Sequence, residues 1–389
     1  MLLYIIAIIF LVTLILGHLF EKLRIPWLFA ALLVGIAFNL LGLNESFSGF
    51  SDYELLGSLG MYFMLFLVGF NLSTEKLREI SDVVVKTTLG IQVLSTAVWT
   101  LVLMAFGYPF SVALVIGLTA HCVGEAVLVP ILDEFKLLNT KIGAAVIGIG
   151  VLDDVFEVAA LLIAGLIVTK VGFSSLFNIL ASFVIIGLMV ITTLIFVKTK
   201  KVKRRLFRFP EIEQLMLAGF AIFFVFLALG DFAKAEGIGA ILAGIALRNL
   251  VPSNELKMAD YGIRSVGYSL FGPLFFAWVG MSLDIHSILI FPMLTIAFYV
   301  IPMATKVAVS WAFMKKRFKD IGGLFAGIAL SIRFSTELAV AQFLFVNKII
   351  DSILFTAIVS SSVLATLISP ALLIYVIKHY GSTIRRIGK

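Results

Sequence analysis

The sequence has few of the residues on which soluble enzymes build their chemistry. Its only cysteine is Cys122, which excludes an intramolecular disulfide and a cysteine-based metal cage. The four histidines, at positions 18, 121, 286 and 379, are too scattered to form a ligand cluster. Charged residues make up only 14% of the chain, against about 25% in an average soluble protein. These absences exclude a water-soluble enzyme, and we expect neither enzymatic activity nor a cofactor.

The chain is instead rich in long apolar runs. Of its 389 residues, 61% are hydrophobic, and the mean hydropathy is +1.13. A helix needs about 20 apolar residues to cross a bilayer. Thirteen candidate spans occur, at approximately 2–20, 26–43, 54–72, 83–106, 109–132, 140–169, 174–197, 210–230, 237–249, 261–283, 286–314, 320–346 and 350–377. The sequence therefore predicts an all-α polytopic membrane protein with about 13 transmembrane helices.

The basic residues predict an orientation in the cell membrane. The loops after odd-numbered spans, together with the C-terminal tail, hold 25 of the 30 lysines and arginines, whereas the other loops hold only Lys170, Lys234 and Lys348. Cytoplasmic loops carry an excess of Lys and Arg, so we expect an outside N-terminus and a cytoplasmic C-terminus. The run from Lys198 to Arg208 has the composition to bind anionic lipid or RNA, but a topology-setting loop explains it better, and no nucleic-acid partner is expected.

Several ionisable residues fall within the apolar spans. Burying one ionised group at the bilayer centre costs about 2.5–3.5 kcal/mol on insertion scales, so such groups should face water or one another. Seven such residues in one chain indicate a functional site. They are Glu125, Asp153, Asp154, Glu157, Lys306, Arg333 and Glu337.

The sixth span contains the densest acidic cluster. Asp153 and Asp154 point about 100° apart on a helix and need different environments. Glu157 lies one turn further on and can join the same cluster. Carboxylates that are close together in a low dielectric resist ionising at the same time, so at least one should bind and release protons near physiological pH. Such a carboxylate can hold either a proton or a hard monovalent cation, which makes it a competitive exchange site.

Lys306, in the middle of the eleventh span, is a candidate counter-ion for this cluster. A lysine readily loses its proton when it is buried and its carboxylate partner is taken away. An Asp–Lys pair that is broken by cation binding would therefore release a proton. The alternative is a lysine that snorkels from a helix end, but the central position of Lys306 argues against it.

Two spans combine glycine, hydroxyl and ionisable side chains halfway along, as interrupted helices do. The first interruption lies near 117–126, with Thr119, His121 and Glu125, and the second near 327–337, with Arg333 and Glu337. Each is the fifth member of a set of six spans, which predicts two inverted-topology repeats whose broken helices meet at a transport site. The expected organisation is a first repeat over 1–172, a linker helix and basic cytoplasmic loop over 173–209, and a second repeat over 210–389.

An ordered set of short motifs resembles the monovalent cation:proton antiporter-2 family, the branch of NapA-like and NhaA-like sodium/proton antiporters. The resemblance runs over nearly the whole chain. Its motifs are Arg24-Ile25-Pro26 with Leu33-Val34-Gly35, Leu65-Phe66-Leu67-Val68-Gly69, Leu152-Asp153-Asp154, Phe275-Phe276 with Gly280-Met281-Ser282-Leu283-Asp284, Lys306, and Arg333 with Glu337.

The resemblance implies a function and roles for single residues. Asp154 would bind the transported metal cation, Asp153 would pair with Lys306, and exchange would be electrogenic. The fold would combine a mobile core domain, in which the broken helices cross, with a dimerisation domain. A homodimer surrounded by membrane lipids would exchange Na⁺ or Li⁺ for H⁺ in pH homeostasis. Arg333 and Glu337 would pair with core residues for structure more than for transport.

The sequence also departs from the family pattern. His121 and Glu125 stand where small or hydroxyl side chains are usual, and Glu157 is an additional acid. Glu125 would be protonated, paired with Arg333, or part of a site for a different ion. His121 is either a pH sensor or a satisfied polar residue at a helix break. Two alternatives stay open: a K⁺/H⁺ antiporter or K⁺ efflux protein of this fold, and an ion channel or ion-sensing receptor that uses the same charges for gating.

Overall fold

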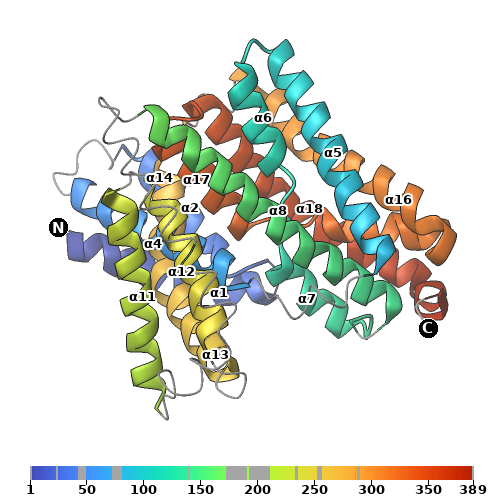
Figure 1. Ribbon diagram of the computed structural model, residues 1–389, viewed down its shortest axis with the longest axis horizontal. Helices are drawn as coiled ribbons and strands as arrows, with labels where there is room; N and C mark the ends of the chain where they lie inside the picture. The colour runs from blue at the N-terminus through green and yellow to red at the C-terminus, as the bar shows by residue number, and fades with distance from the viewer. Residues whose placement is uncertain are drawn as a thin grey trace. The chain divides into compact units, whose positions relative to one another are not determined.

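The computed structural model describes the chain as a set of helices (Figure 1). The described residues are 2–22, 25–42, 50–71, 81–138, 140–171, 191, 211–232, 235–251, 256–284, 286 and 290–387, and no β-strand occurs among them. Within these ranges, six helices are long and apolar enough to cross a membrane. Three shorter apolar helices accompany them. The prediction of an all-α polytopic membrane protein is confirmed.

The helices divide between two compact units. The first unit consists of Met1–Ser73 and Leu161–Leu283, and the second of Thr74–Ala160 and Asp284–Lys389. Each unit therefore combines a segment from the first half of the chain with one from the second half. The compact units are not the two predicted repeats, whose boundaries remain a prediction. The predicted seventh span and basic linker, at 173–209, lie outside the described residues except for position 191.

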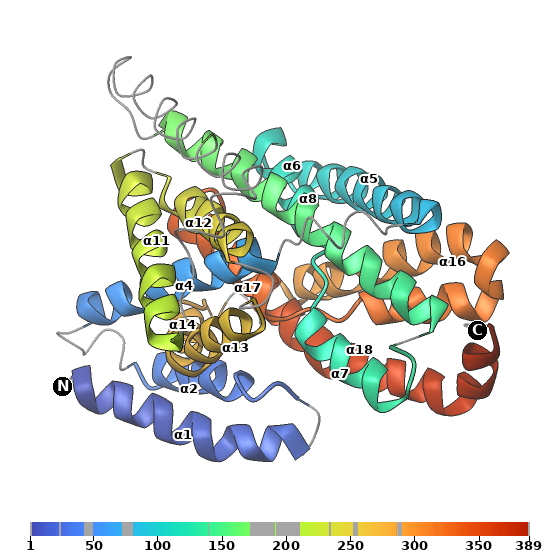
Figure 2. The same cartoon turned by 60° about the horizontal axis from the view of Figure 1, so that its bottom comes forward.

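In the first unit, helices from the two halves of the chain cross at glycines. The helices are α1 (Leu2–Lys22), α2 (Phe29–Leu40), α4 (Phe50–Asn71), α11 (Ile212–Phe232), α12 (Glu236–Leu250), α13 (Leu256–Val266), the π-helical turn η2 (Gly267–Phe271) and α14 (Gly272–Met281). α2 packs on α14, and α4 on α12. A Cβ atom on Gly35 would lie 2.0 Å from the carbonyl oxygen of Ala277, so this crossing requires glycine. Figure 2 shows α12 beside α11 in this unit.

The second unit contains both interrupted helices. Its elements are α5 (Asp82–Ala105), α6 (Phe110–Thr119), α7 (Glu125–Glu134), α8 (Lys141–Val171, of which residues up to Ala160 belong here), α16 (Pro292–Leu330), α17 (Ser335–Val346) and α18 (Ser352–Ile387). α6 and α7 are the halves of the first interrupted helix. The predicted interruption near 117–126 corresponds to the break between Thr119 and Glu125.

α16 consists of two helical segments that meet at a sharp kink. Phe318 and Lys319 have non-helical backbone angles, and Lys319 has a φ of 56° in the left-handed region. The second segment runs from the kink to Leu330, where it stops, and the chain resumes as α17 at Ser335. The second predicted interruption, near 327–337, corresponds to this break.

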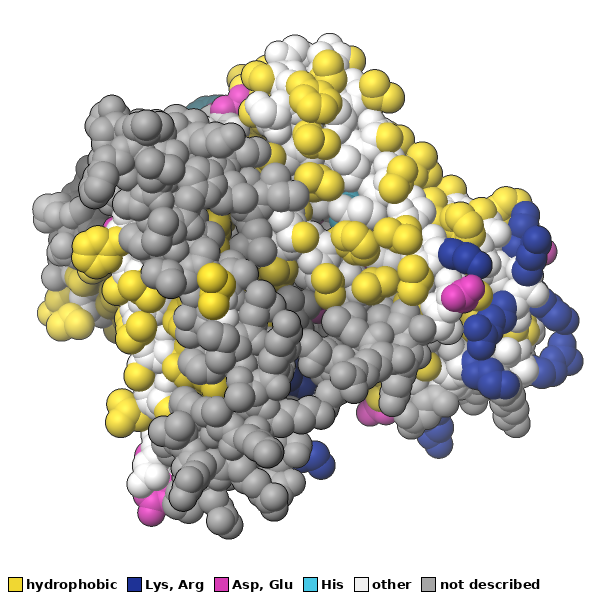
Figure 3. Space-filling model, viewed as in Figure 1, with side chains coloured by type: hydrophobic (Ala, Val, Ile, Leu, Met, Phe, Trp, Pro, Cys, Tyr) yellow, Lys and Arg dark blue, Asp and Glu magenta, His cyan; other side chains and the backbone are white. Residues whose placement is uncertain are grey.

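The surface of the second unit separates apolar from basic side chains. Hydrophobic side chains are spread over the face formed by α5 and α6 (Figure 3). Lys and Arg side chains gather at one end of this unit, around the kink of α16 and the start of α5. α16 contributes Lys315, Lys316, Arg317 and Lys319 to this end. An apolar belt with basic residues at one end is the pattern expected of a core that spans a bilayer.

Candidate functional site

The two interrupted helices of the second unit meet through their backbones. The N–H of Gly124, at the end of the first break, donates to the carbonyl of Ile332 in the second break over 2.7 Å. A Cβ atom on Gly124 would lie 3.2 Å from the Cα of Arg333, so the two chains approach closely here. A helix break leaves backbone groups without helical partners. We call this meeting of the two breaks the crossing. The bond pairs one N–H with one carbonyl, and further carbonyls in the breaks can accept hydrogen bonds from side chains.

Lys306, on α16, forms hydrogen bonds to both interrupted helices at the crossing. Its Nζ donates to the carbonyl of Cys122 over 3.0 Å and to that of Leu330 over 2.6 Å. Cys122 lies in the first break, and Leu330 is the last residue before the second. Since carbonyls at a helix C-terminus carry partial negative charge, a buried ammonium group between them is electrostatically favoured. Lys306 is 1% exposed, which excludes a snorkelling lysine.

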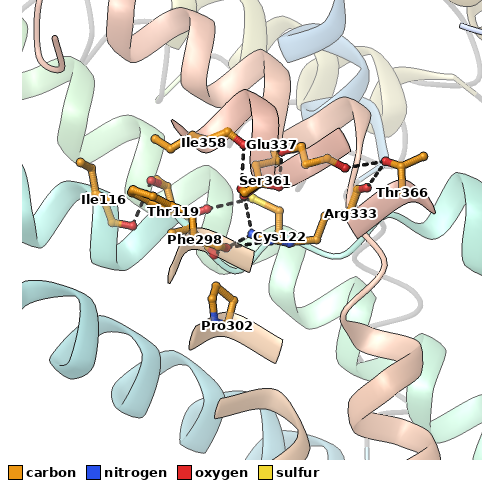
Figure 4. Close-up of polar contacts among 12 residues, drawn as sticks. Ile116, Thr119, Cys122, Phe298, Pro302, Arg333, Glu337, Ile358, Ser361 and Thr366 are labelled. Carbon is orange, nitrogen blue, oxygen red and sulfur yellow. Dashed lines mark hydrogen bonds and ion pairs between the residues drawn. The ribbon is translucent and has the colours of Figure 1, made fainter. Parts of the chain in front are cut away.

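A proline one turn before Lys306 leaves a backbone carbonyl of α16 free for a second contact at the crossing. Pro302 has no N–H, so the carbonyl of Phe298, four residues earlier, lacks its helical donor. The guanidinium of Arg333 donates to this carbonyl through NH2 over 2.9 Å. Its NH1 lies 3.3 Å from the carbonyl of Ala120 in the first break. Arg333 thus connects the second break to α16 and to the first break (Figure 4).

Arg333 also forms a buried ion pair with Glu337 on α17. NH1 of Arg333 lies 2.5 Å from Oε1 of Glu337, and both side chains are almost fully buried. The second carboxylate oxygen accepts a hydrogen bond from the Ser362 hydroxyl over 2.6 Å. The hydroxyl of Thr366 donates to the backbone carbonyl of Arg333 over 2.9 Å. Figure 4 shows Arg333, Glu337 and Thr366 close together. Both charged side chains of the ion pair have hydrogen-bond partners besides each other, which favours a structural role.

α8 brings the predicted acidic residues to the crossing. Asp153 is buried, and its Oδ1 lies 3.3 Å from Nδ1 of His121, in the first break. Among the described residues, neither Oδ2 of Asp153 nor either ring nitrogen of His121 has a hydrogen-bond partner, so the 3.3 Å contact is an electrostatic one. Asp154, the next residue, is also buried. The acidic pair therefore lies in the protein interior next to the interrupted helix, where an ion has to be bound by protein groups.

Glu157 lies one turn beyond Asp153 and is buried as well. By distance and angle, neither of its carboxylate oxygens accepts a well-formed hydrogen bond from a described residue, but the Cys122 thiol lies close enough to interact with the carboxylate. It lies within electrostatic range of Asp153 and beside Cys122, whose thiol donates to the carbonyl of Thr119. The Thr119 hydroxyl donates to the carbonyl of Val115 in its own helix. Thr119 is thus a helix-end residue, and Glu157 lies beside the Cys122 thiol.

The structure brings most of the predicted residues together, with one difference in pairing. His121, Asp153, Asp154, Glu157, Lys306, Arg333 and Glu337 are all buried in the second unit. The expected ion pair between Asp153 and Lys306 is not formed: the two groups lie within electrostatic range, but Lys306 bonds to carbonyls and Asp153 contacts His121. Glu125 begins α7, and its side chain lies outside those that the structure describes. Its suggested pairing with Arg333 therefore stays untested.

Sequence reasoning missed three partners of the crossing. Ser362 and Thr366, both on α18, and the carbonyl of Phe298 complete the surroundings of Arg333 and Glu337. The serine run from Ser360 to Ser362 in an apolar span was a signal for the first of these. The Phe298 carbonyl was foreseeable from Pro302, because a proline inside a helix always frees the carbonyl four residues before it.

Comparisons with known proteins find similar sequences and a similar fold. A family model described as sodium/hydrogen exchanger, transmembrane, matches residues 6–377. The probable Na(+)/H(+) antiporter 3 of Methanocaldococcus jannaschii is 22% identical over 387 residues, with 97% of this chain and 96% of the relative covered. The Na(+)/H(+)-K(+) antiporter GerN of Bacillus cereus is 24% identical over 378 residues, 95% of each chain. The solved structure of the sodium proton antiporter MjNhaP1 from M. jannaschii matches over 100% of both chains, with a TM-score of 0.61 and 16% identity, and is alike in fold.

Proposed function

Because the chain belongs to the sodium/hydrogen exchanger family, whose members are membrane transporters, we propose that it exchanges Na⁺ for protons by alternating access. The observation that carries this function is the burial of Asp153, Asp154 and Lys306 around a crossing of two interrupted helices. In transporters, irregular backbone and ionisable side chains at membrane depth line the path of an ion. Buried carboxylates cost free energy, and a protein that only spans the bilayer does not need them.

The exchange follows from competition at one carboxylate. Asp154 binds either a proton or the cation, because the same oxygens are needed for both. When the cytoplasmic side is alkaline, Asp154 loses its proton and takes Na⁺. The loaded second unit then presents the site to the other side, where protons displace the cation. The transported metal ion is cargo, and Asp154 is its proposed ligand.

Lys306 and Arg333 have structural roles in this mechanism. Both cations bond to carbonyls at the crossing, so that they hold the halves of the interrupted helices together while the site changes access. A buried, fully bonded Arg333–Glu337 pair is a poor carrier of protons, since either partner left alone is strongly disfavoured. The two broken helices and α8 then move as one body.

The distribution of basic residues supports the membrane arrangement proposed here. The N-terminus lies outside and the C-terminus lies in the cytoplasm, because Lys and Arg concentrate in one set of loops. The first unit presents exposed apolar residues along α1, such as Leu3 and Leu14, to lipid or to a second copy of the chain. A homodimer is the proposed assembly, with the second unit as the moving part.

Two other functions make different predictions. One relative bears a name that includes K⁺, so a K⁺/H⁺ exchanger is the second candidate. An ion channel with the same charges is a third, from another class. A coupled exchanger moves protons against their gradient when it is driven by a cation gradient, and a channel moves ions only downhill.

The test is a transport assay in proteoliposomes that contain a pH-sensitive dye. Imposed gradients of Na⁺, Li⁺ and K⁺ should drive protons uphill with Na⁺ and Li⁺ and weakly with K⁺. Asp154→Asn should reduce this movement to background. Asp82→Asn is the matched control, because Asp82 is exposed at the start of α5, where it pairs with Lys86. Uphill proton movement at the wild-type rate in Asp154→Asn would overturn the assignment, and a response to K⁺ alone would select the second candidate.

A further inference from the structure

The kink of α16 is the tip of a helical hairpin. A Cβ atom on Gly323, after the kink, would lie 2.7 Å from the Cα of Trp311, before it. A Cβ atom on Gly327 would lie 2.4 Å from the Cα of Val307. The two segments of α16 therefore run back along each other in close contact. We call residues 315–320, where the chain turns, the hairpin tip.

The hairpin tip is positively charged. It contains four basic residues and one acidic residue, which gives a net charge of +3. Its basic side chains are Lys315, which is partly buried, and Lys316, Arg317 and Lys319, which are exposed. Among the described residues, none of these four side chains is in an ion pair. The tip therefore presents positive charge that the described part of the chain leaves unpaired (Figure 3).

Trp311 connects the hairpin tip to the apolar part of the hairpin. Its indole N–H donates to the carboxylate of Asp320, across the kink, over 2.8 Å. The ammonium group of Lys315 lies 3.6 Å from the centre of a Trp311 ring. The acid of the tip is thus bonded to an indole, and Trp311 itself is 39% exposed. Exposed indole rings of this kind are enriched at the membrane–water interface, because one part of the ring is apolar and the N–H is polar.

Exposed apolar side chains lie next to the tip on both segments of the hairpin. Phe313 lies before the tip and Leu324 after it, and more than a third of each is exposed. Because α16 is long and apolar enough to cross a membrane, these side chains are placed to face lipid, and the charged tip lies at the level of the headgroups. A nucleic acid or an acidic protein would leave the apolar side chains uncovered. A phospholipid supplies both an anionic headgroup and acyl chains.

We propose that the hairpin tip of α16 binds the headgroups of anionic phospholipids in the adjoining leaflet. Clusters of four or more Lys and Arg residues next to a membrane-spanning helix attract such lipids. The planar guanidinium of Arg317 can donate two parallel hydrogen bonds to a phosphate, and the lysines add positive charge around it. Zwitterionic phosphatidylcholine carries no net charge and does not complement the tip. The inference goes beyond the exchange function and does not depend on it, because the contact requires only that the second unit spans a membrane.

The first experiment measures lipid binding through stability. The full chain, purified in a non-ionic detergent, is titrated with dioleoyl phosphatidylglycerol or dioleoyl phosphatidylcholine, and the thermal unfolding midpoint is recorded. Phosphatidylglycerol should raise the midpoint, and phosphatidylcholine at the same concentrations should not. In the tip variant Lys316→Gln, Arg317→Gln, Lys319→Gln, the phosphatidylglycerol concentration that gives half of the effect should rise about tenfold or more, because each basic residue near an anionic surface strengthens binding several-fold.

The matched control removes the same charge elsewhere. Lys22, Lys141 and Lys257 are exposed residues outside the hairpin tip, and replacing all three with Gln should leave the response to phosphatidylglycerol as in the wild type. An unchanged response in the tip variant, an equal loss in the control variant, or a wild-type midpoint that ignores phosphatidylglycerol would each overturn the proposal. An equal rise with soluble glycerol 1-phosphate would do the same, since it would indicate a site for free phosphates and not for a leaflet.

The second experiment locates the lipid through the fluorescence of Trp311, which bromine atoms in lipid chains quench on contact. Vesicles contain equal amounts of phosphatidylglycerol and phosphatidylcholine, with brominated chains on one lipid or on the other. The signal of Trp311 is the difference between the wild type and Trp311→Phe, which keeps an aromatic ring within reach of Lys315. Quenching of Trp311 should be stronger when phosphatidylglycerol carries the bromine, and the tip variant should lose this difference. Equal quenching by the two lipids in the wild type would show that no anionic lipid is bound at the tip.

Discussion

The ammonium group of Lys306 lies 2.6 Å from the carbonyl oxygen of Leu330, the last residue before the second helix break. With its bond to the Cys122 carbonyl, this makes Lys306 a link between the two interrupted helices. The link depends on a charge placed among backbone dipoles, so the charge and the length of the side chain both matter.

Replacing Lys306 should therefore weaken the fold as well as transport. In Lys306→Gln the shorter amide cannot reach both carbonyls, and hydrogen bonds to charged groups contribute about 1.5–3 kcal/mol each. We expect a clear fall in the thermal unfolding midpoint in detergent, together with loss of exchange. Lys316→Gln, on the exposed face of α16, should change neither. A variant with a wild-type midpoint would show that the ammonium group does not hold the crossing.

The buried Arg333–Glu337 pair should behave as a unit. Glu337→Leu or Arg333→Met alone leaves a buried charge without its partner, which costs roughly 3–5 kcal/mol. The double variant Arg333→Met with Glu337→Leu removes both charges and should be less unstable than the sum of the single changes. Unfolding midpoints of the four proteins give the coupling directly. Additive effects would mean that the two groups do not stabilise each other.

Glu157 should tolerate loss of its charge. Among the described residues, the hydrogen-bonding group beside its carboxylate is the Cys122 thiol, which is a weak donor, so Glu157→Gln removes no strong hydrogen bond and we expect stability to stay within about 1 kcal/mol of the wild type. Transport should persist with an altered pH profile, since a neighbour of Asp153 no longer competes for protons. The pH dependence of the initial Na⁺-driven rate tests this. A profile that matches the wild type over the whole range would make Glu157 a bystander.

Gly327 should not accept even one methyl group. A Cβ atom there would lie 2.4 Å from the Cα of Val307, a backbone atom of the segment that carries Lys306. Gly327→Ala should destabilise the protein by about 1–3 kcal/mol or more, because overpacking forces the helices apart. Gly381→Ala in α18 is the control, since its nearest neighbour would be 3.6 Å away. Equal unfolding midpoints for the two variants would contradict the close packing.

Tyr108 should stabilise the loop before α6 up to alkaline pH. Its hydroxyl donates to Asp351 over 3.2 Å, and partial burial together with the Asp351 charge raises the pKa of Tyr108 to about 12. The raised pKa favours the neutral phenol in the folded protein. The stabilisation is therefore complete below pH 10 and is lost as the pH rises through about 12. Tyr108→Phe should lower the unfolding midpoint slightly at pH 8, and the difference should vanish above pH 12.

The sequence predicted the architecture because the bilayer imposes a simple length rule. Long apolar runs indicated the spans, and glycines that share such runs with polar residues, such as Gly124 and Gly327, indicated where helices are interrupted. Asp153 and Lys306 were identified because an ionisable residue in an apolar span is rarely accidental. These inferences need only local patterns, and the structure brings the residues together in the second unit.

The partners of those residues were not predictable in the same way. The expected Asp153–Lys306 pair assumes that charges meet charges, but the break in a helix creates carbonyl acceptors that no side-chain pattern records. The ammonium group of Lys306 donates to two such carbonyls, and Asp153 contacts His121 instead. Which free carbonyls lie next to Lys306 depends on how the two interrupted helices cross in the folded protein. The pairing of Arg333 with Glu337 was not predicted either, although their i, i+4 spacing permits it.

The burial of Cys122 makes this chain convenient for spectroscopy. The thiol is 1% exposed and donates to the Thr119 carbonyl, so it should react slowly with maleimides while the crossing is intact. Spin labels or fluorophores can then be attached to cysteines introduced at exposed positions without first removing the native one. Under conditions that open the crossing, the rate at which Cys122 is alkylated would measure how often the crossing opens.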